Sequence, residues 1–188
     1  MMSNRNAVSL KGQVLEAARK LFMERGYEAV GMRDIAEAVG KQPVQVYRLK
    51  LSKTDILAEL IIELNREQIE LIPALCKRVR RTGALDRTCG YLRELYKFDI
   101  QYLPIRSVGA AFGWMWSAEQ ERRVVEQVGQ LVTPVVRWMQ DAGLEDVQAR
   151  VVGIWSLYYV GYRDAVIHGG SARDCLKAIK PSLRYYFQ

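Results

Sequence analysis

The side chains best equipped for specific chemistry lie in one short segment near the N-terminus. Gln42, Gln45 and Arg48 carry carboxamide and guanidinium groups, which make paired hydrogen bonds to the polar edges of nucleic-acid bases. The neighbouring groups suited to phosphates belong to Lys41, Tyr47, Lys50 and Lys53. The segment therefore favours hydrogen bonding to a polyanion, and Arg33 and Val44 complete the expected contact set.

Two short helices joined by a tight turn are expected to position these side chains. The first is predicted by an apolar stripe at helical spacing, formed by Met32, Ile35, Ala36 and Val39. Gly40 should end this helix, because glycine readily adopts positive φ. Pro43 suits the first turn of a second helix, which would bury Val46 and leave the glutamines and Arg48 outside. Such a pair places a recognition helix in the DNA major groove.

The segment from about Val14 to Leu57 resembles the N-terminal domain of the TetR family of bacterial transcriptional regulators. The matches follow the family's order and spacing without a gap, and they are Leu15-Glu-Ala-Ala-Arg-Lys-Leu-Phe22, Arg25-Gly-Tyr27, Arg33-Asp-Ile-Ala-Glu-Ala38, Tyr47 and Ser52-Lys53. The resemblance implies a helix-turn-helix domain that binds an operator in double-stranded DNA. Beyond this segment the chain resembles the family in being helical and of suitable length.

Several positions depart from the family's pattern. Where the family usually has a small hydroxyl residue, an apolar residue, a Ser, a Gly and an aromatic residue, this chain has Gly31, Lys41, Gln42, Val44 and Lys50. Leu49 or Leu51 is expected to make the core contact of the missing aromatic ring. An alternative therefore stays open, in which the chain is a ligand-binding or interaction module on the same scaffold that has lost operator recognition.

Composition and charge indicate a globular chain with a basic N-terminal part. The 188 residues are 49% apolar and 26% charged, which favours a folded chain with a substantial core. Residues 1–53 carry ten Lys or Arg against five Asp or Glu, whereas residues 54–188 carry eighteen against sixteen. This excess suits phosphate binding. We expect a DNA-binding domain at 1–53 and an all-helical effector-binding and dimerisation domain at 54–188.

An all-α fold is expected throughout. A helix from roughly Leu10 to Arg25 should form the back wall of a three-helix module. Ser52 and Asp55 have the spacing of a capping box and should begin a helix that Pro73 limits, which would link the two domains mechanically. Further helices are expected at about 74–81, 85–103, 104–116, 118–142, 145–168 and 172–187, with Pro134 and Pro181 kinking or dividing two of them.

Aromatic residues are concentrated in the C-terminal part, and two interpretations compete. An aromatic stripe at helical spacing is most often core, yet an apolar site edged by hydroxyl and indole groups also suits an organic ligand. The candidate lining residues are Tyr91, Phe98, Phe112, Trp114, Trp138, Trp155 and Tyr158. The expected effector is small and largely apolar, either aromatic or acyl. Arg106 either holds an acidic group of this effector or lies at the surface.

The last two helices offer more apolar surface than one small domain needs. Their apolar residues are Val147, Val151, Ile154, Trp155, Tyr158 and Tyr162 on one helix, and Leu176, Ile179, Leu183, Tyr186 and Phe187 on the other. In the resembled family these two helices pair with their copies in a four-helix bundle, so the resemblance implies a homodimer and a roughly palindromic operator. A solvated basic face is expected at Arg173, Lys177, Lys180 and Arg184.

Other classes of function find little support in the sequence. His168 is the only histidine, and it falls at a predicted helix C-terminus, where it would interact with free carbonyls rather than perform catalysis. We expect no enzyme, no metal site and no cofactor, because no suitably spaced residues are found. Cys76, Cys89 and Cys175 are expected to be reduced, mostly buried thiols. No apolar run is long enough to span a membrane and no signal peptide is found, so a cytoplasmic protein is expected.

Overall fold

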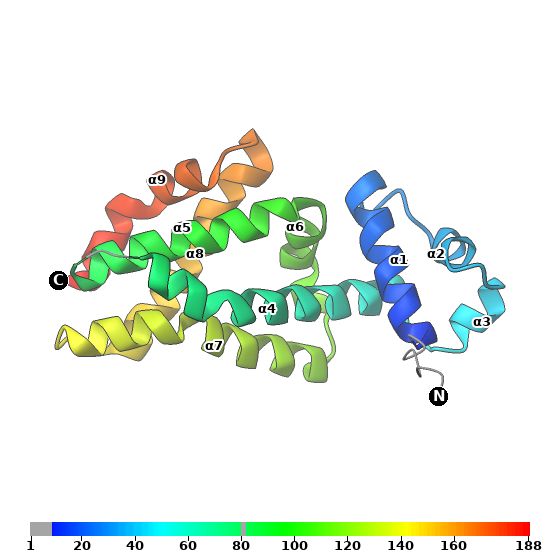
Figure 1. Ribbon diagram of the computed structural model, residues 1–188, viewed down its shortest axis with the longest axis horizontal. Coiled ribbons are helices and arrows are strands. Elements are labelled where there is room, and N and C mark those ends of the chain that lie inside the picture. The colour runs from blue at the N-terminus through cyan, green and yellow to red at the C-terminus, as the bar shows by residue number, and fades with distance from the viewer. Residues whose placement is uncertain (1–8, 80–81) are drawn as a thin grey trace, which may run out of the picture.

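The chain forms an elongated all-helical molecule, as expected. A computed structural model describes residues 9–79 and 82–188, and no strand occurs among them. The N-terminal helices occupy one end of the molecule and the C-terminal helices the other, with one long helix running between them (Figure 1). No helix in the described ranges combines the length and the apolarity that a membrane span requires.

The N-terminal module consists of α1 (Leu10–Arg25), α2 (Met32–Ala38) and α3 (Pro43–Tyr47), which lie where the sequence predicts them. Ser9 caps α1 by accepting the Gly12 N–H at 3.1 Å. Gly40 follows α2 with φ +64°, and the Lys41 N–H closes the turn by donating to the Ala36 carbonyl at 2.9 Å.

A compact core holds the three helices together. Val14, Ala18 and Phe22 of α1 are buried against Ile35 of α2 and Val46 of α3. Only one of Leu49 and Leu51 was expected to pack against this core, but both of them do. The side chain of Lys50, which lies between them in the sequence, is exposed.

The linking helix α4 (Lys53–Arg78) is longer than the sequence predicts. Its start is confirmed, because Ser52 Oγ accepts the Asp55 N–H at 3.0 Å and the Asp55 carboxylate accepts the Ser52 N–H at 2.9 Å. The prediction that Pro73 limits this helix was wrong, because α4 continues through Pro73 to Arg78. The start of the separate helix expected at about 74–81 is therefore part of α4, and residues 80 and 81 lie outside the described residues. A proline inside a helix costs about 3 kcal/mol, but α4 buries Leu75 two residues further on. We attribute the continuation of α4 to this packing.

The C-terminal helices agree with the predicted ranges to within a few residues. They are α5 (Ala84–Gln101), α6 (Leu103–Phe112), the 3-10 turn η1 (Gly113–Met115), α7 (Ala118–Asp141), α8 (Val147–His168), α9 (Ala172–Leu183) and the 3-10 turn η2 (Arg184–Phe187). Pro134 does not divide α7, and α9 continues for two residues past Pro181 before the 3-10 turn begins.

Helix α6 contributes to both ends of the molecule. Ile105 and Phe112 belong to the core that α1–α3 form with the start of α4, and the rings of Phe112 and Tyr27 are 5.5 Å apart. Other residues of α6 face the C-terminal helices. The core of the N-terminal module therefore includes a helix that lies about fifty residues further along the chain than Lys53.

Two glycines in helices give opposite predictions for stability. A Cβ at Gly161 of α8 would meet the Tyr96 hydroxyl and would lie 2.7 Å from the Cys175 carbonyl oxygen, whereas a Cβ at Gly129 of α7 would meet nothing within 4 Å. Gly161→Ala should lower the free energy of unfolding by about 1–3 kcal/mol through overpacking. Gly129→Ala should raise it by about 0.5–1 kcal/mol, because alanine favours helix. Urea denaturation of both variants checks this, and equal effects would contradict the close approach of α8 to α5 and α9.

Candidate functional site

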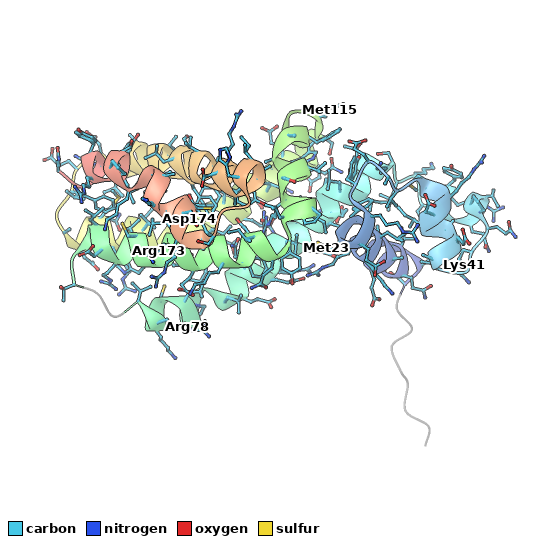
Figure 2. The ribbon with its side chains drawn as sticks, turned by 90° about the horizontal axis from the view of Figure 1, so that it is seen from above. Met23, Lys41, Arg78, Met115, Arg173 and Asp174 are labelled. Atoms are coloured by element: carbon cyan, nitrogen blue, oxygen red, sulfur yellow. The ribbon has the colours of Figure 1, made fainter. Side chains whose placement is uncertain are left out.

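Helix α3 presents a polar face to solvent at one end of the molecule. Val46 is 1% exposed and anchors the helix, while Val44 and Tyr47 are 57% and 54% exposed. The other outward side chains, all exposed, are those of Arg33, Lys41, Gln42, Gln45, Arg48 and Lys50. Residues 41–53 contain four basic residues and no acidic residue. The face therefore combines hydrogen-bonding groups with positive charge, and Lys41 lies at the tip far from Arg173 of α9 (Figure 2).

Gln45 has a structural role that the sequence analysis did not anticipate. Its side-chain oxygen accepts the Gln42 backbone N–H at 3.1 Å, and Gln42 makes no side-chain cap of its own. Gln45 thus supplies one half of a capping box, because its side chain at the third helical position accepts the backbone N–H of the N-cap residue. Its amide NH₂ group takes no part in this bond, and the side chain is exposed.

The two lysines beyond α3 differ in their environment. Lys50 is exposed and adopts φ +53°, a left-handed conformation that costs a residue with a Cβ about 1–2 kcal/mol. The Lys53 ammonium lies 4.0 Å from the centre of the Tyr27 ring, in a cation–π contact with the N-terminal core. Lys50 is therefore better placed than Lys53 to reach an external anion.

The strain at Lys50 predicts that its replacement by glycine stabilises the chain. Lys50→Gly should raise the free energy of unfolding by about 1 kcal/mol, because glycine adopts positive φ without a clash. Lys50→Ala is the matched control, since it removes the same charge and keeps the Cβ. Thermal and urea denaturation should rank glycine above both lysine and alanine. A glycine variant no more stable than the alanine variant would contradict the left-handed conformation at this position.

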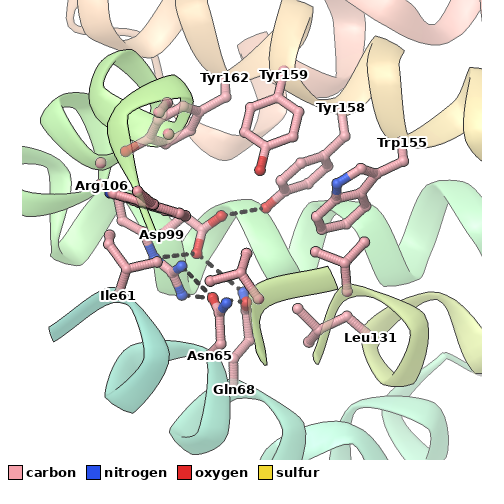
Figure 3. A pocket seen from close by; sticks show the side chains of 16 residues that line it. Ile61, Asn65, Gln68, Asp99, Arg106, Leu131, Trp155, Tyr158, Tyr159 and Tyr162 are labelled. Atoms are coloured by element: carbon pink, nitrogen blue, oxygen red, sulfur yellow. Dashed lines mark hydrogen bonds and ion pairs between the residues drawn. The ribbon is translucent and has the colours of Figure 1, made fainter. Parts of the chain in front are cut away.

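An interior pocket of about 130 Å³ lies among the C-terminal helices. Aromatic side chains of α8 form one side of it, and polar side chains of α4, α5 and α6 form the other (Figure 3). Its lining includes Asn65 and Gln68 of α4, Asp99 of α5 and Arg106 of α6. A ligand entering this pocket would meet aromatic rings and a charged network together.

The charged network is centred on Asp99 and Arg106, whose side chains are 10% and 11% exposed. The Arg106 Nε lies 3.2 Å from Asp99 Oδ1. Gln68 donates to the same carboxylate oxygen at 3.1 Å, and Arg106 donates to the side-chain oxygen of Asn65. The network thus joins α4, α5 and α6, and each buried charge in it has a partner of opposite sign.

Tyr158 attaches α8 to this network. Its hydroxyl donates to Asp99 Oδ2 at 2.7 Å. Its ring is stacked between Tyr96 and Trp155, with ring centres 4.2 Å and 5.0 Å away and interplanar angles of 7°. Burial, together with the negative charge of Asp99, raises the pKa of Tyr158 well above its usual range. The hydroxyl therefore stays protonated and donates at all physiological pH values.

Of the predicted ligand-binding residues, Trp155 and Tyr158 line the interior pocket. Tyr91 is fully buried, donates to the Leu131 carbonyl at 2.8 Å and packs edge-on against Trp138. Phe98 and Phe112 belong to the core shared with α1–α3. The Trp114 side chain lies outside the described residues. Tyr91, Phe98, Phe112 and Trp138 do not line this pocket, because they pack against other helices.

The polar residues of the pocket were not predicted from the sequence. Asn65 and Gln68 lie three residues apart, on the buried side of α4, and are 4% and 2% exposed. A polar pair with helical spacing beside an apolar stripe was the signal that could have indicated them. Arg106 was left open between a pocket and a surface position, and it lies in the pocket.

Several of the apolar residues expected at the dimer contact face inward rather than outward. Ile154, Tyr158 and Ile179 are at most 2% exposed, so they cannot supply the surplus apolar surface that the sequence analysis assigned to them. A different stripe of α8 is exposed, and it consists of Val152, Tyr159, Val160, Val166 and Ile167. Of the solvated basic face expected on the last helix, Arg173, Lys177 and Arg184 are exposed and Lys180 is half-buried.

The remaining reactive side chains are placed as follows. Cys89 and Cys175 are buried and Cys76 is half-buried. His168 is the last residue of α8 and is exposed. Within residues 9–79 and 82–188, no group of three or more His, Cys, Asp or Glu side chains has a metal-binding arrangement.

Breaking the ion pair should destabilise the chain more than removing it. Arg106→Gln would leave the Asp99 carboxylate buried without its positive partner, at a cost of about 3–5 kcal/mol. The double variant Arg106→Gln, Asp99→Asn should recover part of this loss. Arg122→Gln, at an exposed ion pair on α7, is the control and should change stability little. Additive losses in a urea double-mutant cycle would contradict a coupled network.

Comparisons with known proteins support the resemblance of the N-terminal segment. Residues 14–60 match the family described as bacterial regulatory proteins, tetR family. A TetR/AcrR-family transcriptional regulator from Thermobifida fusca is 22% identical, with a TM-score of 0.63 over 92% of this chain and 95% of that chain. The regulator FadR from Bacillus subtilis, solved with stearoyl-CoA, is 17% identical, with a TM-score of 0.64 over 93% and 96%.

The same fold also occurs in a protein that is described as a superantigen and not as a transcriptional regulator. The superantigen PfiT is 20% identical, with a TM-score of 0.62 over 96% of this chain and 97% of that chain. A comparison with curated proteins found no match. At these identities the structural likeness shows the fold alone, and one fold can support different functions.

Proposed function

We propose that the chain is a transcriptional regulator that binds DNA through α3 and is controlled by a small molecule bound among its C-terminal helices. The observation that carries the proposal is the polar, acid-free face of α3, which is held outward by Val46 in the core of a helix-turn-helix. The match of residues 14–60 to the tetR family supports the same function. In this proposal the DNA-binding domain is residues 1–53, and residues 54–188 bind the effector and dimerise.

The recognition chemistry follows from the side chains that α3 exposes. Gln42, Gln45 and Arg48 face base edges, while Lys41, Tyr47 and Lys50 contact phosphates. The Gln45 oxygen is engaged in capping α3, so Gln45 reads a base as a donor through its NH₂ group. An acceptor on a base edge is therefore its preferred target.

Control by a ligand follows from the way α4 and α6 are joined. Arg106 of α6 binds Asn65 of α4 in the pocket, and Ile105, its neighbour in sequence, is buried in the N-terminal core. A ligand that prefers one arrangement of these helices would shift the N-terminal module, and typical coupling of about 1–3 kcal/mol changes DNA affinity roughly 5- to 150-fold. FadR, which has the same fold, was solved with stearoyl-CoA, and this supports ligand control.

We further propose a cytoplasmic homodimer that binds a roughly palindromic operator and represses transcription until the effector binds. A single short helix reads too few bases for specificity, so two recognition helices are needed. The last two helices would form the dimer contact, with the exposed stripe of Val152, Val160 and Ile167 on α8 at its centre. Exposed apolar stripes of this kind are typical of interfaces.

The alternative is a ligand-binding or interaction module that has lost operator recognition. Val44 and Lys50 stand where the resembled family usually has other residues, and PfiT shares the fold under a different description. The two functions differ in one measurable property, which is sequence-specific binding to DNA that flanks the chain's own gene.

Gel-shift and footprinting assays with that flanking DNA test the proposal. The chain should protect a roughly palindromic site, and Lys50→Ala should weaken binding to all sequences while reducing the salt slope by about one. Arg173→Ala is the matched control, because Arg173 is basic and exposed on α9, and it should change neither quantity. Absence of any protected site, or equal effects of the two substitutions, would favour the alternative.

A further inference from the structure

Besides Arg106 Nε, which makes only the ion pair with Asp99, two buried donor groups of the interior pocket have no hydrogen-bond partner among the described residues. They are the hydroxyl of Tyr162, a residue that is 5% exposed, and the indole Nε1 of Trp116, and both residues line the pocket. A buried polar group without a hydrogen bond costs about 1–3 kcal/mol. Such groups are retained where something else supplies the bond, and an indole N–H can only donate. The pocket therefore calls for an acceptor.

The formal charges inside the pocket are already balanced. Arg106 and Asp99 form an ion pair, and Tyr158 and Gln68 satisfy the same carboxylate. A ligand carboxylate or phosphate would bring a second negative charge next to Asp99 and compete for its only buried cationic partner within the described ranges. Burying an unpaired charge is far more costly than burying a neutral acceptor. The electrostatics of the pocket thus favour an uncharged ligand.

The size and the walls of the pocket limit the shape of the ligand. Its volume of about 130 Å³ is close to that of an engineered cavity of about 150 Å³ that holds benzene. The Trp155 ring, stacked parallel to Tyr158, forms part of the wall. Flat aromatic walls favour a planar partner through offset or edge-to-face packing. A long acyl chain does not fit a pocket of this size.

We propose that the effector is a small, planar, uncharged molecule that carries a hydrogen-bond acceptor, such as a carbonyl or ring nitrogen, which Tyr162 and Trp116 bind. This inference rests on the proposed ligand control and narrows it to one chemical class. The sequence was compatible with acyl and acidic ligands. The proposal replaces them with a neutral aromatic molecule that accepts hydrogen bonds.

Three single-ring probes of similar size test the proposal with the full-length protein. Acetophenone has a neutral acceptor, ethylbenzene has no acceptor, and benzoate has a negative charge. Ligand-observed NMR titrations should give saturable binding that is tightest for acetophenone and weakest for benzoate. Tighter binding of benzoate than of acetophenone overturns the proposal. So does failure of all three probes to bind, the result expected if water alone satisfies the donors.

Substitutions locate the binding and separate it from simple loss of structure. Tyr162→Phe and Trp116→Phe should each weaken acetophenone binding about 2- to 10-fold, the range for one neutral hydrogen bond, and leave ethylbenzene binding unchanged. Tyr162→Phe should fold normally, because its hydroxyl has no partner in the described structure to lose. Tyr185→Phe, at a residue 72% exposed, is the matched control. Unchanged acetophenone affinity in Tyr162→Phe overturns the proposal.

The gel-shift assay keeps this inference distinct from the regulator proposal. A chain that binds flanking DNA specifically but binds none of the probes remains a regulator, and only the ligand class is then wrong. A chain that binds acetophenone through Tyr162 but protects no DNA site retains its ligand class and loses the regulator function.

Discussion

The positive charge of Arg106 is buried inside the helical bundle and has to be compensated there. Asp99 supplies the opposite charge, and Asn65 and Gln68 accept hydrogen bonds from the guanidinium. An unpaired ion in this environment would cost several kcal/mol, so α4, α5 and α6 have to meet where these groups meet. Helix α8 has to meet them as well, because the Tyr158 hydroxyl donates to Asp99. The relative positions of four helices thus depend on one ion pair.

Helix α6 connects the two ends of the molecule, because one of its sides belongs to the pocket and the other to the N-terminal core. Arg106 and Gly109 face the pocket, while Ile105 and Phe112 are packed in the core of α1–α3. A Cβ at Gly109 would lie 2.5 Å from the Ile61 side chain, so the absence of a side chain at Gly109 allows Ile61 of α4 to pack against the backbone of α6. A change in the pocket that moves α6 therefore moves groups in the N-terminal core.

Local patterns were sufficient to predict most of the helices, and they were insufficient to predict the end of α4 and the lining of the pocket. The capping pair Ser52 and Asp55 and the left-handed Gly40 act within a few residues, so the helix boundaries they set could be predicted. Pro73 was misjudged because the packing of Leu75 depends on helices far along the chain. The lining of the pocket was not predicted for the same reason, because the side of a helix that faces a cavity depends on the helices packed against it. Most of the aromatic residues predicted to line the pocket are packed in the core instead.

Native-state hydrogen exchange in Arg106→Gln tests the claim that the ion pair connects the pocket to the N-terminal module. Amides of α1 and α2 should exchange faster than in the unmodified chain, because α6 carries Ile105 into their core. Leu92→Ala removes a buried side chain of the C-terminal core that is not a member of the network. This control should leave the amides of α1 and α2 protected. Faster exchange confined to α5, α6 and α8 in Arg106→Gln, with α1 and α2 unchanged, would contradict the connection.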